Sequence, residues 1–171
     1  MTYLDTSALV KGFVAEPGSP VVRGILAATE PVVTATIAYA EVHAAFWRRQ
    51  RAGDLSRTQH ALASRQFERE WHAYLRVELR DEILRLARDL IRRHPLRGFD
   101  AIHLASAVSL ARTLGEETTF VAADRALLRA ARASGSPGST PNPRRGGDKP
   151  GVVMAGAPMQ GHGRGRRRCQ T

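Results

Sequence analysis

The chain has 171 residues, a length that suits one domain with some residues left over. Hydrophobic residues make up 43% of it, enough for an aliphatic core, and no apolar run approaches the roughly 20 residues that a membrane-spanning helix needs. The only cysteine, Cys169, excludes an internal disulfide and a cysteine-built metal site, and with no signal peptide visible we expect a cytoplasmic protein.

The formal net charge of +10 favours a polyanionic partner, with nucleic acid as the first candidate. This charge is unevenly distributed along the chain. Residues 136–171 hold seven basic residues and one acidic residue, so they contribute +6 of the total. The first 135 residues are therefore only mildly basic, and surface charge of that size also serves solubility alone.

The first half of the chain is predicted to begin with a short buried strand and to continue mainly as helices. The expected elements, in order, are a strand over 2–5, helices over 7–13 and 19–28, a strand over 32–35, and helices over 36–53 and 57–75. Gly53 stands where a glycine commonly follows a helix, and Ser56 is typical of the residue that caps the next helix.

The second half continues the alternation of strands and helices. It predicts a strand over 74–79, an amphipathic helix over 80–94, a helix over 99–115 that is apolar nearly all round, a strand over 118–123 and a helix over 124–135. Such alternation indicates a three-layer α/β/α fold, with a short parallel sheet between two layers of helices. Ligands of such sheets lie beyond the carboxyl ends of the strands.

Residues 136–171 differ in kind from the preceding domain. Glycine, proline, serine and arginine dominate them, and neither a helical nor a strand period is present. A segment of this composition buries too little apolar surface to offset its chain entropy. We therefore predict a domain over 1–135 followed by a disordered basic tail over 136–171.

Four acidic residues are predicted to lie near the carboxyl edge of the sheet. Asp5 ends the first strand, Glu41 lies early in the helix after the second, Asp100 begins the apolar helix, and Asp124 follows the fourth strand. Each alone is explained by helix capping or by the helix dipole. Together, the carboxylates would repel one another unless a cation neutralised them.

The predicted oxygen ligands suit Mg²⁺ or Mn²⁺, with no histidine or cysteine required. Divalent ions held by carboxylates activate water and stabilise the leaving oxygen in phosphodiester cleavage. His103, three residues after Asp100, is interpreted as a hydrogen-bonded core histidine in preference to a ligand.

The chain resembles the PIN-domain ribonucleases, in particular the VapC-type toxins of bacterial toxin–antitoxin pairs. Four segments within residues 1–135 carry the resemblance: YLDTSALVKGFVAEPGS, TATIAYAEVHAAFWRRQRAGDLS, HPLRGFDAIHLASA and FVAADRALLRAA. Matched residue by residue, the acidic pocket of the family implies Asp5, Glu41, Asp100 and Asp124 as catalytic metal ligands. Thr6 or Ser7 would then orient Asp5 or a bound water, or cap the helix that follows.

The resemblance also implies an activity and partners. It implies metal-dependent endonucleolytic cleavage of RNA, a homodimer, and neutralisation by a small antitoxin within a type II toxin–antitoxin system. In one respect the chain departs from the family pattern, because no β-branched run directly follows the last helix. We therefore expect the final edge strand to be missing, with residues 136–171 forming either a basic arm that binds RNA or a divergent end.

Three alternatives remain open. A haloacid-dehalogenase-like phosphatase also has an aspartate after its first strand, but it needs an acid two residues later, where Ser7 stands. A PIN-like module could bind RNA or a partner without cleaving RNA, and the presence of all four acids argues against it. A DNA nuclease of related fold is disfavoured by the small size and the toxin-like first segment.

Overall fold

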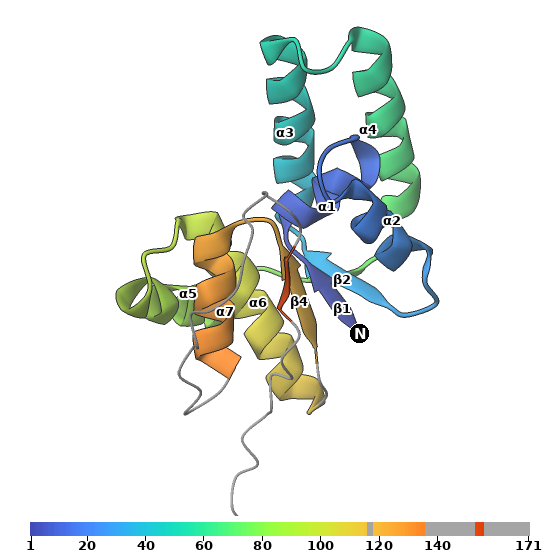
Figure 1. The fold of residues 1–171 in the computed structure, drawn as a ribbon. Coiled ribbons are helices and arrows are strands. Elements are labelled where there is room, and N and C mark those ends of the chain that lie inside the picture. Colours follow the sequence, from blue (N-terminus) through green and yellow to red (C-terminus); the bar gives the residue numbers. More distant parts are fainter. Residues whose placement is uncertain (116–117, 136–152, 156–171) are drawn as a thin grey trace, which may run out of the picture.

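The structure, a computed structural model, describes residues 1–115, 118–135 and 153–155 (Figure 1). The strands are β1 (Thr2–Leu4), β2 (Val32–Ala35), β3 (Leu75–Val77), β4 (Thr119–Ala122) and β5 (Val153–Ala155). The helices are α1 (Thr6–Phe13), α2 (Ser19–Ala27), α3 (Ala38–Ala52), α4 (Arg57–Trp71), α5 (Asp81–Arg93), α6 (Gly98–Leu114) and α7 (Arg125–Gly135). Among the described residues, no helix is both long and apolar enough to cross a membrane.

The strands form one sheet in the order β3-β2-β1-β4-β5. β1 lies at its centre and runs parallel to both neighbours, with Tyr3 opposite Val33 of β2 and Phe120 of β4. β3 is parallel to β2, whereas β5 is antiparallel to β4. The carboxyl ends of β1 to β4 therefore lie along the same edge of the sheet, which positions the residues that follow them.

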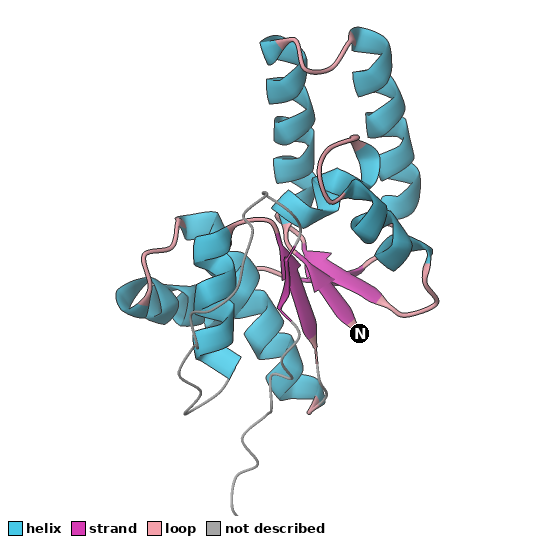
Figure 2. Cartoon of the chain, viewed as in Figure 1, coloured by secondary structure: helices cyan, strands magenta, loops and turns pink. Residues whose placement is uncertain are grey.

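Alternate residues of the strands face two separate hydrophobic cores. Tyr3 and Phe120 pack with α5, α6 and α7 on one face. Leu4 and Val121 pack on the other face with residues of α1, α3 and α4. Figure 2 shows the strands between these two groups of helices. The predicted three-layer α/β/α architecture is confirmed.

The helix boundaries agree with the predicted glycine and serine signals. Gly53 follows α3 with φ 87°, a left-handed conformation in which a side chain would be strained. Ser56 begins α4 with a capping box, in which its side chain accepts from the Gln59 N–H and the Gln59 side chain accepts from the Ser56 N–H. Local chemistry therefore fixes the turn between these two helices.

The expectation that the final edge strand is missing is wrong. Residues Val153–Ala155 form β5, in which Met154 lies opposite Val121 of β4. The strand was missed because it is short and does not follow α7 directly, but comes after a stretch rich in glycine and proline. Three residues of the predicted tail thus belong to the sheet, while the disorder predicted for the rest of 136–171 lies outside the described residues.

Candidate active site

Asp5 lies at the carboxyl end of β1, where it also caps α1. Its backbone N–H donates to the Val121 carbonyl (3.1 Å), and its Oδ1 accepts from the Ala8 N–H (2.8 Å). The Ser7 hydroxyl donates to the carboxylate, at 2.9 and 2.8 Å from its two oxygens, and accepts from the Ala123 N–H at 2.8 Å. Ser7 therefore orients Asp5 and links the ends of β1 and β4.

Burial makes the Asp5 carboxylate difficult to ionise. The residue is only 3% exposed, and desolvation raises its pKa to about 6, although the charge of His103 and the hydrogen bonds from Ala8 and Ser7 act in the opposite direction. The groups around Asp5 therefore do not fully offset the cost of burying its ionised carboxylate.

Glu41, in the first turn of α3, is held by two hydrogen bonds. The Thr6 hydroxyl donates to Glu41 Oε2 at 2.7 Å, and His103 Nε2 lies 2.9 Å from the same oxygen. Since a carboxylate only accepts, His103 donates to Glu41 at Nε2, and its Nδ1 lies 3.1 Å from the Tyr3 hydroxyl oxygen. Desolvation opposes ionisation of Glu41, but the hydrogen bonds from His103 and Thr6 outweigh it and lower its pKa.

Asp100 lies in the first turn of α6 and is half-buried. Desolvation raises its pKa, and the negative charge of Asp124 raises it further, while Arg97 acts in the opposite direction. Asp124 itself is exposed, and its Oδ1 accepts from the Leu127 N–H at 2.8 Å, so it caps α7.

Three of the four predicted acids line one cleft of about 530 Å³. Asp5, Glu41 and Asp100 share it with Thr6, Ser7 and His103. Asp124 is not among the residues that line the cleft, although its charge acts on Asp100. The structure thus brings three acids from distant parts of the sequence to one place and leaves the fourth beside it.

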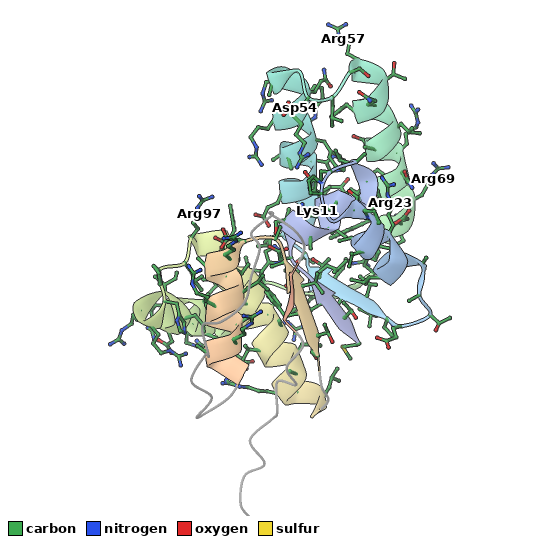
Figure 3. The ribbon with its side chains drawn as sticks, viewed as in Figure 1. Lys11, Arg23, Asp54, Arg57, Arg69 and Arg97 are labelled. Atoms are coloured by element: carbon green, nitrogen blue, oxygen red, sulfur yellow. The ribbon has the colours of Figure 1, made fainter. Side chains whose placement is uncertain are left out.

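Basic side chains line the same cleft as the acids. Its other charged residues are the basic Lys11, Arg48, Arg49 and Arg97 and the acidic Glu16. Glu16 pairs with Lys11 (3.0 Å) and with Arg49 (2.6 Å), whereas Arg48 and Arg97 form no ion pair within the described part of the chain. In Figure 3, Lys11 on α1 and Arg97 before α6 lie toward the same end of the sheet. This end therefore offers positive charge to an anionic ligand.

Sequence reasoning did not identify two features of the cleft. The prediction that His103 is a hydrogen-bonded core histidine is confirmed, whereas its contact with Glu41 is not predicted from the sequence. Its spacing of three residues from Asp100 was the available signal, because residues three apart share a helix face. No sequence pattern pointed to the contacts of Glu16 with Lys11 and Arg49, which join three separate segments.

The donors of the cleft match a divalent cation in chemistry. Carboxylate and hydroxyl oxygens predominate, as Mg²⁺ and Mn²⁺ prefer. The raised pKa values of Asp5 and Asp100 mark negative charge that a cation would compensate. Within the described residues, however, no three acidic, histidine or cysteine side chains are already arranged to hold a metal ion.

Comparison with known proteins identifies relatives over most of the chain. The family model of the PIN domain matches residues 2–133. Ribonuclease VapC45 and ribonuclease VapC49 of Mycobacterium tuberculosis are each 37% identical over 136 residues, which cover 79% of this chain and 92% of theirs. Ribonuclease VapC47 of the same species is 32% identical over 147 residues, covering 81% of this chain and 98% of its own.

Proposed function

The chain belongs to the PIN-domain family, and from this premise we propose that it is a divalent-metal-dependent endoribonuclease of the VapC type. The observation that carries the proposal is the cleft at the carboxyl edge of the sheet, which Asp5, Glu41 and Asp100 line together with basic side chains. The relatives named ribonuclease support RNA as the substrate.

We propose Mg²⁺, with Mn²⁺ as a substitute, as the cofactor. Asp5 and Asp100 would be its principal ligands, together with Glu41, while Asp124 would act through water or a second ion. When bound, the cation would activate water and neutralise the charge that develops during phosphodiester hydrolysis. Ser7 keeps the Asp5 carboxylate in place, and Thr6 with His103 does the same for Glu41.

The basic residues of the cleft have a separate role in this proposal. Arg48 and Arg97 are exposed and free of ion pairs among the described residues, so they are available to phosphate groups of the RNA. Glu16 holds Lys11 and Arg49 by ion pairs at the cleft, which lowers the pKa of Glu16 against its own desolvation. The substrate would therefore meet positive charge before it reaches the acids.

The VapC-type relatives support a biological role as well. We propose that the protein is the toxin of a type II toxin–antitoxin pair, that a cognate small antitoxin neutralises it, that it forms a homodimer, and that it acts in the cytoplasm on cellular RNA. Co-purification with the product of a neighbouring short reading frame, and loss of ribonuclease activity in that complex, would support the antitoxin.

A PIN-like module that binds RNA without cleaving it is the second candidate. It is favoured by the arrangement of the acids, because Glu41 is engaged by Thr6 and His103 and no three donors among the described residues are gathered for a metal. The two candidates agree on RNA binding and differ in the chemistry that follows.

Cleavage of defined single-stranded RNAs, with Mg²⁺ or with EDTA, tests the proposal. We expect cleavage that EDTA abolishes, and a loss of at least about 100-fold in Asp100→Asn, since this change removes a proposed ligand of the cation that stabilises the charge developing on the phosphate. Asp54→Asn is the matched control, because Asp54 is exposed at the far end of the α3–α4 hairpin (Figure 3). RNA binding without metal-dependent cleavage would establish the second candidate instead.

A further inference from the structure

Phe99 presents an exposed aromatic ring at the cleft of the acids. It is 57% exposed, lies in the first turn of α6, and directly precedes Asp100. Of the large hydrophobic residues that are exposed in the described chain, Phe99 is the one that lines this cleft. Single exposed hydrophobic residues are ordinary on protein surfaces, but this ring stands beside the residues proposed to cleave RNA.

The cleft that Phe99 lines is rich in charged side chains, and its other apolar residues are small or buried: Val10, Ala44, Ala45 and Ala123. Arg97 lies two residues before Phe99 and Asp100 directly after it, and Arg48 lines the same cleft from α3. Protein interfaces generally place an aromatic residue within a contiguous apolar patch with few charges at its centre. An aromatic ring that shares a cleft with arginines free of ion pairs among the described residues is instead a combination that binds single-stranded nucleic acid, in which bases stack on the ring and phosphates pair with the cations.

We propose that Phe99 is a stacking platform for an unpaired nucleobase of the substrate and that Arg97 binds a phosphate next to that base. This inference rests on the proposed function and deepens it by assigning substrate-binding roles to two residues. The flat face of a base is accessible only where the base is unpaired and unstacked. The protein would therefore bind single-stranded segments, such as loops, in preference to continuous duplex RNA.

Binding measured in EDTA separates the platform from cleavage. A fluorescently labelled single-stranded 12-nucleotide RNA would be titrated with the full chain and its variants, and its anisotropy recorded. We expect Phe99→Ala to bind roughly 10- to 100-fold more weakly and Phe99→Trp to bind at least as tightly as the unaltered protein. Leu114→Ala is the matched control, since Leu114 is 48% exposed at the opposite end of the same helix.

Substitution of Phe99 should leave the stability of the fold unchanged, so a loss of RNA binding can be assigned to the ring. Because the ring is exposed, Phe99→Ala should retain the thermal unfolding midpoint of the unaltered protein. Arg97→Ala should weaken binding to all sequences and reduce the slope of log affinity against log salt by about 0.7, the value for one phosphate contact on a single strand.

An abasic scan identifies the stacked base itself. RNAs that each lack one base would be bound to the unaltered protein and to Phe99→Ala. If the ring stacks on one base, removal of that base weakens the unaltered protein but causes no further loss in Phe99→Ala. Losses that add at every position, or equal affinity of Phe99→Ala and the unaltered protein, would overturn the platform.

Three further outcomes also overturn the inference, and they are distinguishable. Dissociation of a homodimer by Phe99→Ala in sedimentation, with unchanged RNA affinity per chain, would assign the ring to a contact between two copies. Failure of the unaltered protein to bind or cleave RNA would remove the proposed function and this inference together. Metal-dependent cleavage with equal activity in Phe99→Ala and the unaltered protein would remove the platform alone.

Discussion

The fold buries the carboxylate of Asp5, where its ionised form is energetically unfavourable. The residue is buried at the centre of the sheet edge, and hydrogen bonds from Ser7 and Ala8 stabilise its charge without a salt bridge among the described residues. Its pKa is consequently raised. A bound cation would offset the free-energy cost of burying the ionised carboxylate. The burial that raises the pKa of Asp5 therefore also favours a cation at this position.

The raised pKa of Asp5 predicts how the metal-free protein responds to pH. The folded state holds this proton up to about pH 6, whereas the unfolded state releases it near the ordinary value of 3.8. Stability should therefore fall as pH rises from about 4 to 6, by up to about 3 kcal/mol from this group. In EDTA, Asp5→Asn should lack this contribution, which urea unfolding at several pH values would measure.

Two comparisons complete this test. Asp54→Asn should follow the pH dependence of the unaltered protein, because Asp54 is exposed. Added Mg²⁺ should stabilise the unaltered protein above pH 6 and leave Asp5→Asn nearly unchanged. Parallel stability curves for Asp5→Asn and the unaltered protein would show that ionisation of Asp5 carries no such cost.

At the level of elements, local signals set the turn of the α3–α4 hairpin. Gly53 adopts a left-handed conformation after α3, and its N–H bonds the carbonyls of Arg49 and Gln50. The capping box of Ser56 and Gln59 then begins α4. These signals were legible in the sequence because glycine and capping residues act within a few residues of themselves.

Gly53→Ala should therefore destabilise the protein by about 1 kcal/mol, since a side chain is strained at this positive φ. Gly24→Ala is the matched control with the opposite sign. Gly24 lies inside α2, and an added Cβ would meet no atom within 4 Å, so alanine should stabilise by up to about 1 kcal/mol. Equal effects of the two substitutions in thermal unfolding would contradict this account of the hairpin.

Side-chain contacts between elements were less predictable than the elements themselves. The parallel order of the strands implied that residues after β1 and β4 would lie on one edge, which is where Asp5 and Asp124 are found. The orientation of each side chain was not implied, and Asp124 caps α7 outside the lining of the cleft. The contact of His103 on α6 with Glu41 on α3 joins helices that cover opposite faces of the sheet, and no local pattern encodes it.

For the whole molecule, β5 is the feature that sequence reasoning missed. A three-residue strand carries little periodicity, and its pairing with β4 depends on contacts distant in sequence. The rest of the architecture agrees with the predicted alternation of strands and helices. Because β5 pairs with β4, β4 lies inside the sheet, between β1 and β5, and is not at its edge.

A truncated chain of residues 1–135 should thus be less stable than the full chain, by roughly 2 kcal/mol, because β4 loses the hydrogen bonds of its antiparallel partner. A chain of residues 1–160 is the control, since it keeps β5 and lacks the arginines near the end of the sequence. Denaturant unfolding of the three chains would measure the difference, and equal stability of chains 1–135 and 1–160 would show that β5 contributes nothing.

We propose that acids distant in sequence bind one divalent cation in the cleft, and Mn²⁺ binding followed by electron paramagnetic resonance tests this claim without RNA. The unaltered protein should reduce the signal of free Mn²⁺ in a saturable manner. Asp5→Asn and Asp100→Asn should each bind Mn²⁺ at least about tenfold more weakly, and Asp54→Asn should bind it normally. Undiminished Mn²⁺ binding by both Asp5→Asn and Asp100→Asn would contradict the claim.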